Sequence, residues 1–147
     1  MMMHAVNIVT IVDTIAALSS GSLRNHVYMA DDGWCSERKG TAELATACYP
    51  GQPISWTVHA IDVQSPALIS EIRILDLAPH GPAARFTPGP EAGGAPQWTY
   101  WSGLVPCCLP PGRYGYRLQF QLGRGERSVL SIDTPALNVL SWTGAQS

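Results

Sequence analysis

Clusters of positive charge are missing from this sequence. Its nine Lys and Arg residues are dispersed along 147 residues, and the formal net charge is -2. Proteins that bind nucleic acid or anionic membranes usually gather basic residues on one face. We therefore expect no nucleic-acid partner and no membrane partner. The small net charge also gives little repulsion between copies of the chain, which favours self-association.

A long apolar run is absent as well. No stretch approaches the roughly 20 apolar residues that a membrane-spanning helix needs. The apolar start, Met1 to Leu18, has no positively charged leading region and is interrupted by Asp13, so it lacks the pattern of a secretion signal. We expect a cytoplasmic protein whose four cysteines are reduced thiols.

Motifs for catalysis and metal binding are also lacking. The chain contains His59, Asp62 and several serines, but no Gly-x-Ser-x-Gly elbow supports a hydrolase. We expect no enzymatic activity and no cofactor. The residues with suitable side chains do not occur at zinc-ligand spacing, so we expect no metal site. These residues are His26, His59, His80, Asp31 and Asp32.

The clearest pattern that is present lies between Gly112 and Thr134. Apolar and polar residues alternate strictly from Arg113 to Leu122, which predicts a strand with one buried face. Glycines follow at 123 and 125, and an apolar segment resumes to Thr134. We therefore predict an antiparallel hairpin. Its inner row is Tyr114, Tyr116, Leu118, Phe120 and Leu122, and the outer row includes Arg113, Arg117, Gln119 and Gln121.

Short segments rich in β-branched and aromatic residues, separated by turn residues, predict the remaining strands. The Pro, Gly and Ala-rich stretch from Ala78 to Pro96 is expected to be a surface connection without core residues. We predict a single domain over residues 1–147 that is an all-β, antiparallel β-sandwich, Ig-like or jelly-roll-like, with seven to nine strands. The predicted strands are Ala5–Val12, Asn25–Ala30, Thr41–Tyr49, Ile54–Ala60, Ile69–Leu77 with a bulge near Leu75, Gln97–Leu104 and an edge strand from Ala136 to Trp142.

The order and spacing of five segments resemble the AidA/PixA-type bacterial inclusion-body proteins. The resemblance implies a small, cytoplasmic, non-enzymatic protein, often under quorum-sensing or growth-phase control, which in some members accumulates in crystalline inclusions. Well-known inclusion-forming members are rich in Met, whereas this chain has four, so a methionine-storage role does not carry over. The matching segments are Val6–Thr14, Asn25–Met29, Gly40–Leu44, Pro50–Trp56 and Ile132–Val139.

Three tryptophans are candidate binding residues. Trp34 follows a predicted turn, and Trp101 lies on the opposite side of its strand from Trp98 and Tyr100, so at least one of these rings should lie outside the core. An exposed ring could bind the apolar face of a sugar. Aromatic residues are also enriched at protein interfaces, which favours a subunit contact over a sugar.

Two functions therefore remain open at this point. The leading hypothesis is a non-enzymatic, self-associating protein with an accessory role, storage or host interaction, that forms a homodimer or higher homo-oligomer through strand edges or sheet faces. The alternative is a lectin-like carbohydrate-binding module that uses Trp34 or Trp101. The outer row formed by Arg113, Arg117, Gln119 and Gln121 should be buried between subunits if this sheet face is the interface, and solvated otherwise.

Overall fold

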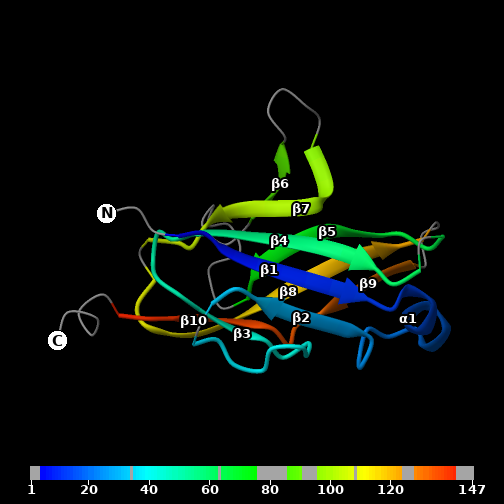
Figure 1. The fold of residues 1–147 in the computed structure, drawn as a ribbon, viewed down its shortest axis with the longest axis horizontal. Helices are drawn as coiled ribbons and strands as arrows, with labels where there is room; N and C mark the ends of the chain where they lie inside the picture. Colours follow the sequence, from blue (N-terminus) through cyan, green and yellow to red (C-terminus); the bar gives the residue numbers. More distant parts are fainter. Residues whose placement is uncertain are drawn as a thin grey trace.

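Two β-sheets pack face to face in the computed structural model of the chain, which describes residues 4–33, 35–62, 64–75, 86–90, 96–107, 109–123 and 128–141. The first sheet has the order β2-β1-β4-β7-β6. In Figure 1, β7, β4, β1 and β2 lie one below another. Its strands are β1 (Val6–Val12), β2 (Val27–Asp31), β4 (Pro53–Ala60), β6 (Thr87–Pro90) and β7 (Pro96–Leu104).

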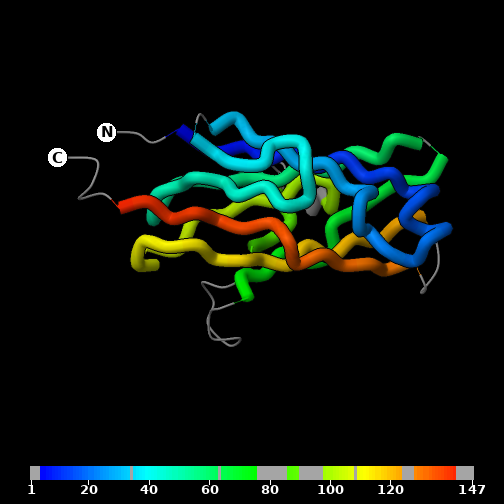
Figure 2. Tube along the Cα trace, turned by 90° about the horizontal axis from the view of Figure 1, so that it is seen from below, coloured from blue at the N-terminus to red at the C-terminus, as the bar shows by residue number. Residues whose placement is uncertain are grey.

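The second sheet has the order β3-β10-β8-β5, and β9 also pairs with β8. The hairpin predicted between Gly112 and Thr134 is confirmed, because β8 and β9 pair antiparallel. Figure 2 looks onto this sheet and shows β10 between β3 and β8. The strands are β3 (Ala45–Cys48), β5 (Ala67–Ile74), β8 (Gly112–Leu122), β9 (Val129–Ile132) and β10 (Ala136–Val139).

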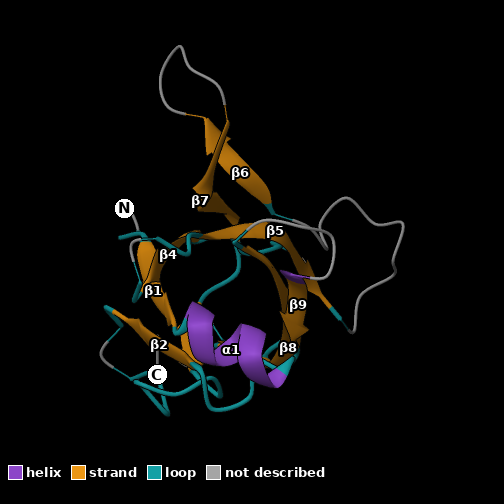
Figure 3. Cartoon of the chain, turned by 90° about the vertical axis from the view of Figure 1, so that its right-hand side faces the viewer, coloured by secondary structure: helices purple, strands orange, loops and turns teal. Residues whose placement is uncertain are grey.

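The all-β sandwich is confirmed, with differences in detail. The described residues form ten strands, and both sheets are mixed, because β1 pairs parallel with β4 and β3 pairs parallel with β10. One short helix, α1 (Thr14–Ser20), follows β1 and lies across one end of the sandwich (Figure 3). The Asp13 side chain accepts a hydrogen bond from the Ala16 amide at 3.2 Å, and Gly21 ends the helix in a left-handed conformation. None of the described helices is long and apolar enough to cross a membrane.

Aromatic side chains join the sheets at the centre of the core. The Trp56 ring lies 4.7 Å from that of Phe86 and 5.5 Å from that of Tyr116, measured between centroids. Phe86 belongs to the stretch that was expected to contribute no core residue, and that expectation is wrong. The fragment from Phe86 to Pro90 returns to the first sheet and pairs with β7, so one large aromatic ring enters the core.

Two predicted details of the strands are also wrong. The bulge in β5 lies between Ile69 and Glu71 rather than near Leu75, which lets Ile69 and Ile72 both face the core although they are three residues apart. The last strand, β10, is central rather than at an edge, because the short β3 pairs along its far side. A strand between two neighbours has paired backbone groups along both edges, and Leu137 on this strand is fully buried.

Candidate functional site

An apolar surface covers part of the outer face of the first sheet. The strand register brings Ala30, Val9, Thr57 and Tyr100 side by side across β2, β1, β4 and β7. The next row contains Tyr28, Ile11 and His59. These side chains are exposed, except for the half-buried Thr57. We call this surface the outer apolar face, formed by Val9, Ile11, Tyr28, Ala30, Thr57, His59 and Tyr100.

A polar row borders the outer apolar face. The side-chain amide and the backbone N–H of Asn7 donate to the two carboxylate oxygens of Asp32, both at 2.9 Å. The Ser55 hydroxyl donates to the side-chain oxygen Oδ1 of Asn7 at 2.7 Å. Burial alone would raise the pKa of Asp32, but the hydrogen bonds from Asn7 outweigh burial, and the pKa lies below its ordinary value. This carboxylate therefore stays charged and marks the limit of the apolar area.

The proposed tryptophan sites differ in position. Trp101 is only 4% exposed, and its Nε1–H donates to the Ile69 carbonyl at 3.1 Å, so its ring is a core residue and offers no platform for a sugar. Trp98 is 46% exposed, with its ring centroid 6.0 Å from that of Trp101. The expectation that one of these rings lies outside the core is confirmed by Trp98, whereas Trp34 lies outside the described residues.

The outer row of β8 is polar and tied to its own chain. Arg117 forms two hydrogen bonds to Asp133, from Nε at 2.7 Å and from Nη2 at 2.9 Å. This pairing holds the pKa of Asp133 below its ordinary value and raises that of Arg117. Gln121 donates to Ser128, Gln119 is half-buried, and Arg113 is exposed. These contacts satisfy much of the row within one subunit, so it offers little to a dry interface.

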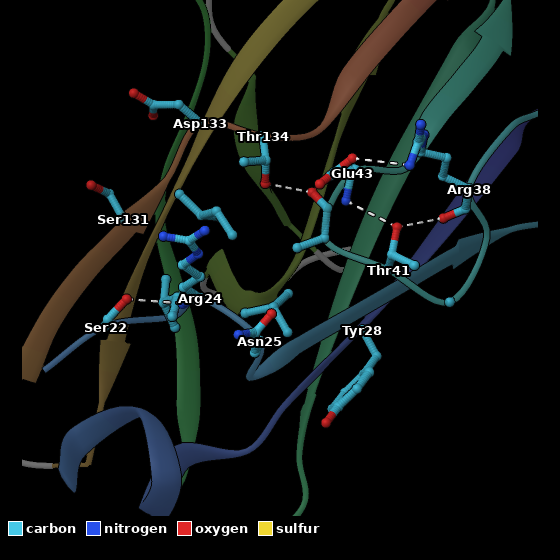
Figure 4. A pocket seen from close by; sticks show the side chains of 15 residues that line it. Ser22, Arg24, Asn25, Tyr28, Arg38, Thr41, Glu43, Ser131, Asp133 and Thr134 are labelled. Atoms are coloured by element: carbon cyan, nitrogen blue, oxygen red, sulfur yellow. Dashed lines mark hydrogen bonds and ion pairs between the residues drawn. The ribbon is translucent and has the colours of Figure 1, made fainter. Parts of the chain in front are cut away.

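A groove opens at the side of the sandwich where β2 of the first sheet approaches β9 of the second (Figure 4). Its volume is about 790 Å³. The walls come from the loop before β2, the loop before β3 and the end of β9, which are far apart in the sequence. The apolar floor is Leu23, Val27 and Ile132, and the polar lining includes Arg24, Asn25, Arg38, Thr41, Glu43, Ser131, Asp133 and Thr134.

Hydrogen bonds connect the walls of this groove. Thr134 donates its hydroxyl to the Ala42 carbonyl at 2.6 Å, which joins the end of β9 to the loop before β3. Within that loop, the Thr41 hydroxyl donates to the Arg38 carbonyl at 2.8 Å, and the Arg38 guanidinium lies 3.3 Å from the Glu43 carboxylate. These contacts fix the positions of the groove walls relative to one another.

The structure does not bring the candidate catalytic and metal-binding residues together in the part of the chain that it describes. His59 is exposed on β4, and the Asp62 carboxylate accepts from the Gln64 amide at 2.8 Å rather than from His59. No group of three or more His, Cys, Asp or Glu side chains in the described residues could hold a metal ion. His80 lies outside these residues.

The sequence contained a signal for one of these surfaces but not for the other. In Val6 to Val12, β-branched residues occupy both faces of the strand, so Val9 and Ile11 had to point away from the core that holds Val6, Ile8 and Val12. The groove combines three separated segments, and no spacing within any of them marks Arg24 or Asn25.

Comparison with known proteins agrees with the fold. Residues 4–128 match the sequence model of a family described as a domain of unknown function, DUF8788. Among solved structures, 14 chains match, including the crystal structure of an inclusion body protein, PixA, from Burkholderia cenocepacia J2315. That similarity has a TM-score of 0.68 and 15% sequence identity, and covers 96% of each chain. No curated protein matches the sequence. The resemblance to PixA-type proteins is thus confirmed in the fold, and the chain belongs to the DUF8788 family.

Proposed function

We propose that this chain is a non-enzymatic, self-associating cytoplasmic protein of the inclusion-body type, with an accessory role in storage or host interaction. The observation that carries the proposal is the outer apolar face. Exposed Val, Ile and Tyr side chains of β1, β2 and β7 form one surface there together with Thr57 and His59 of β4. Isolated apolar residues, in contrast, are normal on protein surfaces and need no partner.

A second copy of the chain is the partner that suits this face best. The face carries no Lys, Arg, Asp or Glu side chain, so two copies can stack without bringing like charges together. A flat sheet face can also match itself across a two-fold axis, with each residue contacting its symmetry partner. The polar row of Asn7, Asp32 and Ser55 would then form the rim of the interface.

The fold similarity to PixA, whose structure is that of an inclusion body protein, supports the same proposal. Dimers that form through this face leave the edges of both sheets available for further contacts. Repeated contacts of that kind build the ordered assemblies from which inclusions grow.

The test compares two lysine substitutions at sites of similar exposure. Ile11 is 39% exposed on the outer apolar face, and Leu68 is 36% exposed on β5 of the second sheet. Size-exclusion chromatography with light scattering over a concentration series should give twice the chain mass for the wild type and for Leu68→Lys. Ile11→Lys should give the mass of one chain, because each interface would bury two lysine charges.

Two results would contradict the proposal. If the wild-type protein remains strictly monomeric at high concentration, the proposal of self-association is contradicted. A dimer that persists in Ile11→Lys places the interface elsewhere, and the outer apolar face then has another role. Circular dichroism of each variant separates loss of the interface from loss of the fold.

A further inference from the structure

We propose that the groove between β2 and β9 binds a small hydroxylated organic acid, of the size of a sugar acid, whose carboxylate pairs with Arg24. The first argument is the charge balance. Arg24, Arg38 and Arg117 stand in or beside the groove, against two carboxylates, Glu43 and Asp133. Arg38 is paired with Glu43, and Arg117 with Asp133. One positive charge, that of Arg24, is left without a partner among the described residues.

The position of Arg24 fits this role. In Figure 4 its side chain points from the loop before β2 toward the side of the groove that holds Ser131 and Asp133. Its backbone N–H donates to the Ser22 hydroxyl at 3.0 Å, which fixes the start of the side chain. A guanidinium presents two parallel N–H groups that match the two oxygens of a carboxylate. The free cation therefore has both the position and the shape to bind one acid group.

The backbone around the groove supports a built site. Asn25 and Arg38 have φ angles of 67° and 61°, and they are the two residues other than glycine with positive φ in the described part of the chain. Both line the groove. This conformation is uncommon for a side chain such as Arg and costs free energy that the surrounding contacts must offset. Strained residues of this kind concentrate at ligand sites, because a fixed loop holds its side chains ready for binding.

The other residues that line the groove indicate which class of acid fits it. The Asn25 amide and the Ser131 hydroxyl have no hydrogen-bond partner among the described residues, so they can bind hydroxyl groups. Leu23, Val27 and Ile132 supply an apolar floor for carbon atoms. Tyr28 contributes to the lining, but in Figure 4 its ring turns away from the other labelled side chains. The groove thus offers one charge, several hydrogen bonds and limited apolar contact, which suits a hydroxylated acid better than an aromatic ligand.

Calorimetric titration of the full chain tests the proposal with paired sugars. Galacturonate and glucuronate carry a carboxylate, whereas galactose and glucose have the same ring without it. We expect both acids to bind and the neutral sugars to bind at least about tenfold more weakly, because the charge-assisted hydrogen bonds are lost. Arg24→Gln should weaken the acids by at least about tenfold. Arg113→Gln removes the same charge from an exposed site on β8 and should leave the affinity unchanged.

Each contrary result overturns a stated part of the inference. If neither acid gives binding heat at millimolar concentration, the proposal that the groove binds a sugar acid is contradicted. If the neutral sugars bind as tightly as the acids, the proposed role of the carboxylate is contradicted. Tighter binding of inorganic phosphate than of either acid overturns the ligand class. If Arg24→Gln binds the acids with unchanged affinity and has a native thermal midpoint, the assignment of the site to Arg24 is contradicted. Because Ile11→Lys leaves the groove lining intact, binding measured in that variant separates this inference from the proposed self-association.

Discussion

Trp56 and Tyr116 connect the two sheets through one buried hydrogen bond. Nε1–H of Trp56, on β4, donates to the hydroxyl oxygen of Tyr116, on β8, at 3.1 Å. Both side chains are 0% exposed, and the rings meet edge to face. Since indole N–H groups in a core need an acceptor, this pair fixes how the sheets are positioned over each other.

Replacing Tyr116 by Phe tests this connection. The ring contacts remain, but the Trp56 N–H is left buried without an acceptor, which costs about 1–3 kcal/mol in the free energy of unfolding. Tyr114→Phe is the matched control, because the Tyr114 hydroxyl donates to the Pro110 carbonyl at an exposed site, and its loss should cost less than about 1 kcal/mol. Urea unfolding at pH 7 measures both. If both variants lost the same free energy of unfolding, the buried hydrogen bond would contribute no more to stability than the exposed one.

Cys48 makes stability depend on pH on the alkaline side. Burial, followed by the charge of Asp31, raises the pKa of the Cys48 thiol to about 12. In the unfolded chain the pKa of a thiol is about 8.5. The folded state therefore keeps a proton that the unfolded state releases, and its advantage is complete below pH 8.5 and is lost as the pH rises toward 12.

The measurable effect is a slope. Between pH 9 and pH 10 this thiol should lower the free energy of unfolding by about 1.2 kcal/mol per pH unit. Cys48→Ala is destabilised at every pH by the cavity that it creates, but its slope over this interval should be shallower. Urea titrations at several pH values give both slopes. Parallel curves for wild type and variant would contradict the assignment, as would labelling of Cys48 by iodoacetamide at the rate of the exposed Cys35.

The sequence predicted the buried face of a strand correctly where apolar and polar residues alternate along that strand. In β8 the residues from Tyr116 to Leu122 alternate between core and surface as predicted, since a single face of that strand is buried. In β1 the alternation was hidden, because the outer face carries Val9 and Ile11 and is as apolar as the inner face. The exposure of Val9 and Ile11 is thus a feature that the alternation pattern of the sequence did not reveal.

Other features depend on contacts between distant segments and leave no local pattern. The helix α1 was not predicted, because its seven residues follow a strongly β-branched run and depend on the cap at Asp13 and on Gly21. The parallel pairing of β3 with β10 joins residues about 90 positions apart. The groove requires both the loop before β2 and the end of β9, so the place of Arg24 in its lining could be found only in the folded chain.

The contact between Phe86 and Gly103 leads to the last prediction. A methyl group at Gly103 would lie 2.7 Å from the Phe86 ring, closer than two carbon atoms can approach. Phe86 cannot withdraw easily, because it is 5% exposed and packs against Trp56. Gly103→Ala should therefore destabilise the fold by about 1–3 kcal/mol through overpacking.

Gly115 provides the control for this substitution, since it is also a strand glycine but has no atom closer than 3.9 Å to the added methyl group. Gly115→Ala should be neutral or slightly stabilising, because alanine restricts the unfolded chain. Combining Gly103→Ala with Phe86→Leu should recover part of the loss, since the smaller side chain can yield space. Thermal and urea unfolding of the three variants measure these differences. If Gly103→Ala and Gly115→Ala were equally stable, the segment from Phe86 to Pro90 would not be held against the core, and the first sheet would lose its outermost strand, β6.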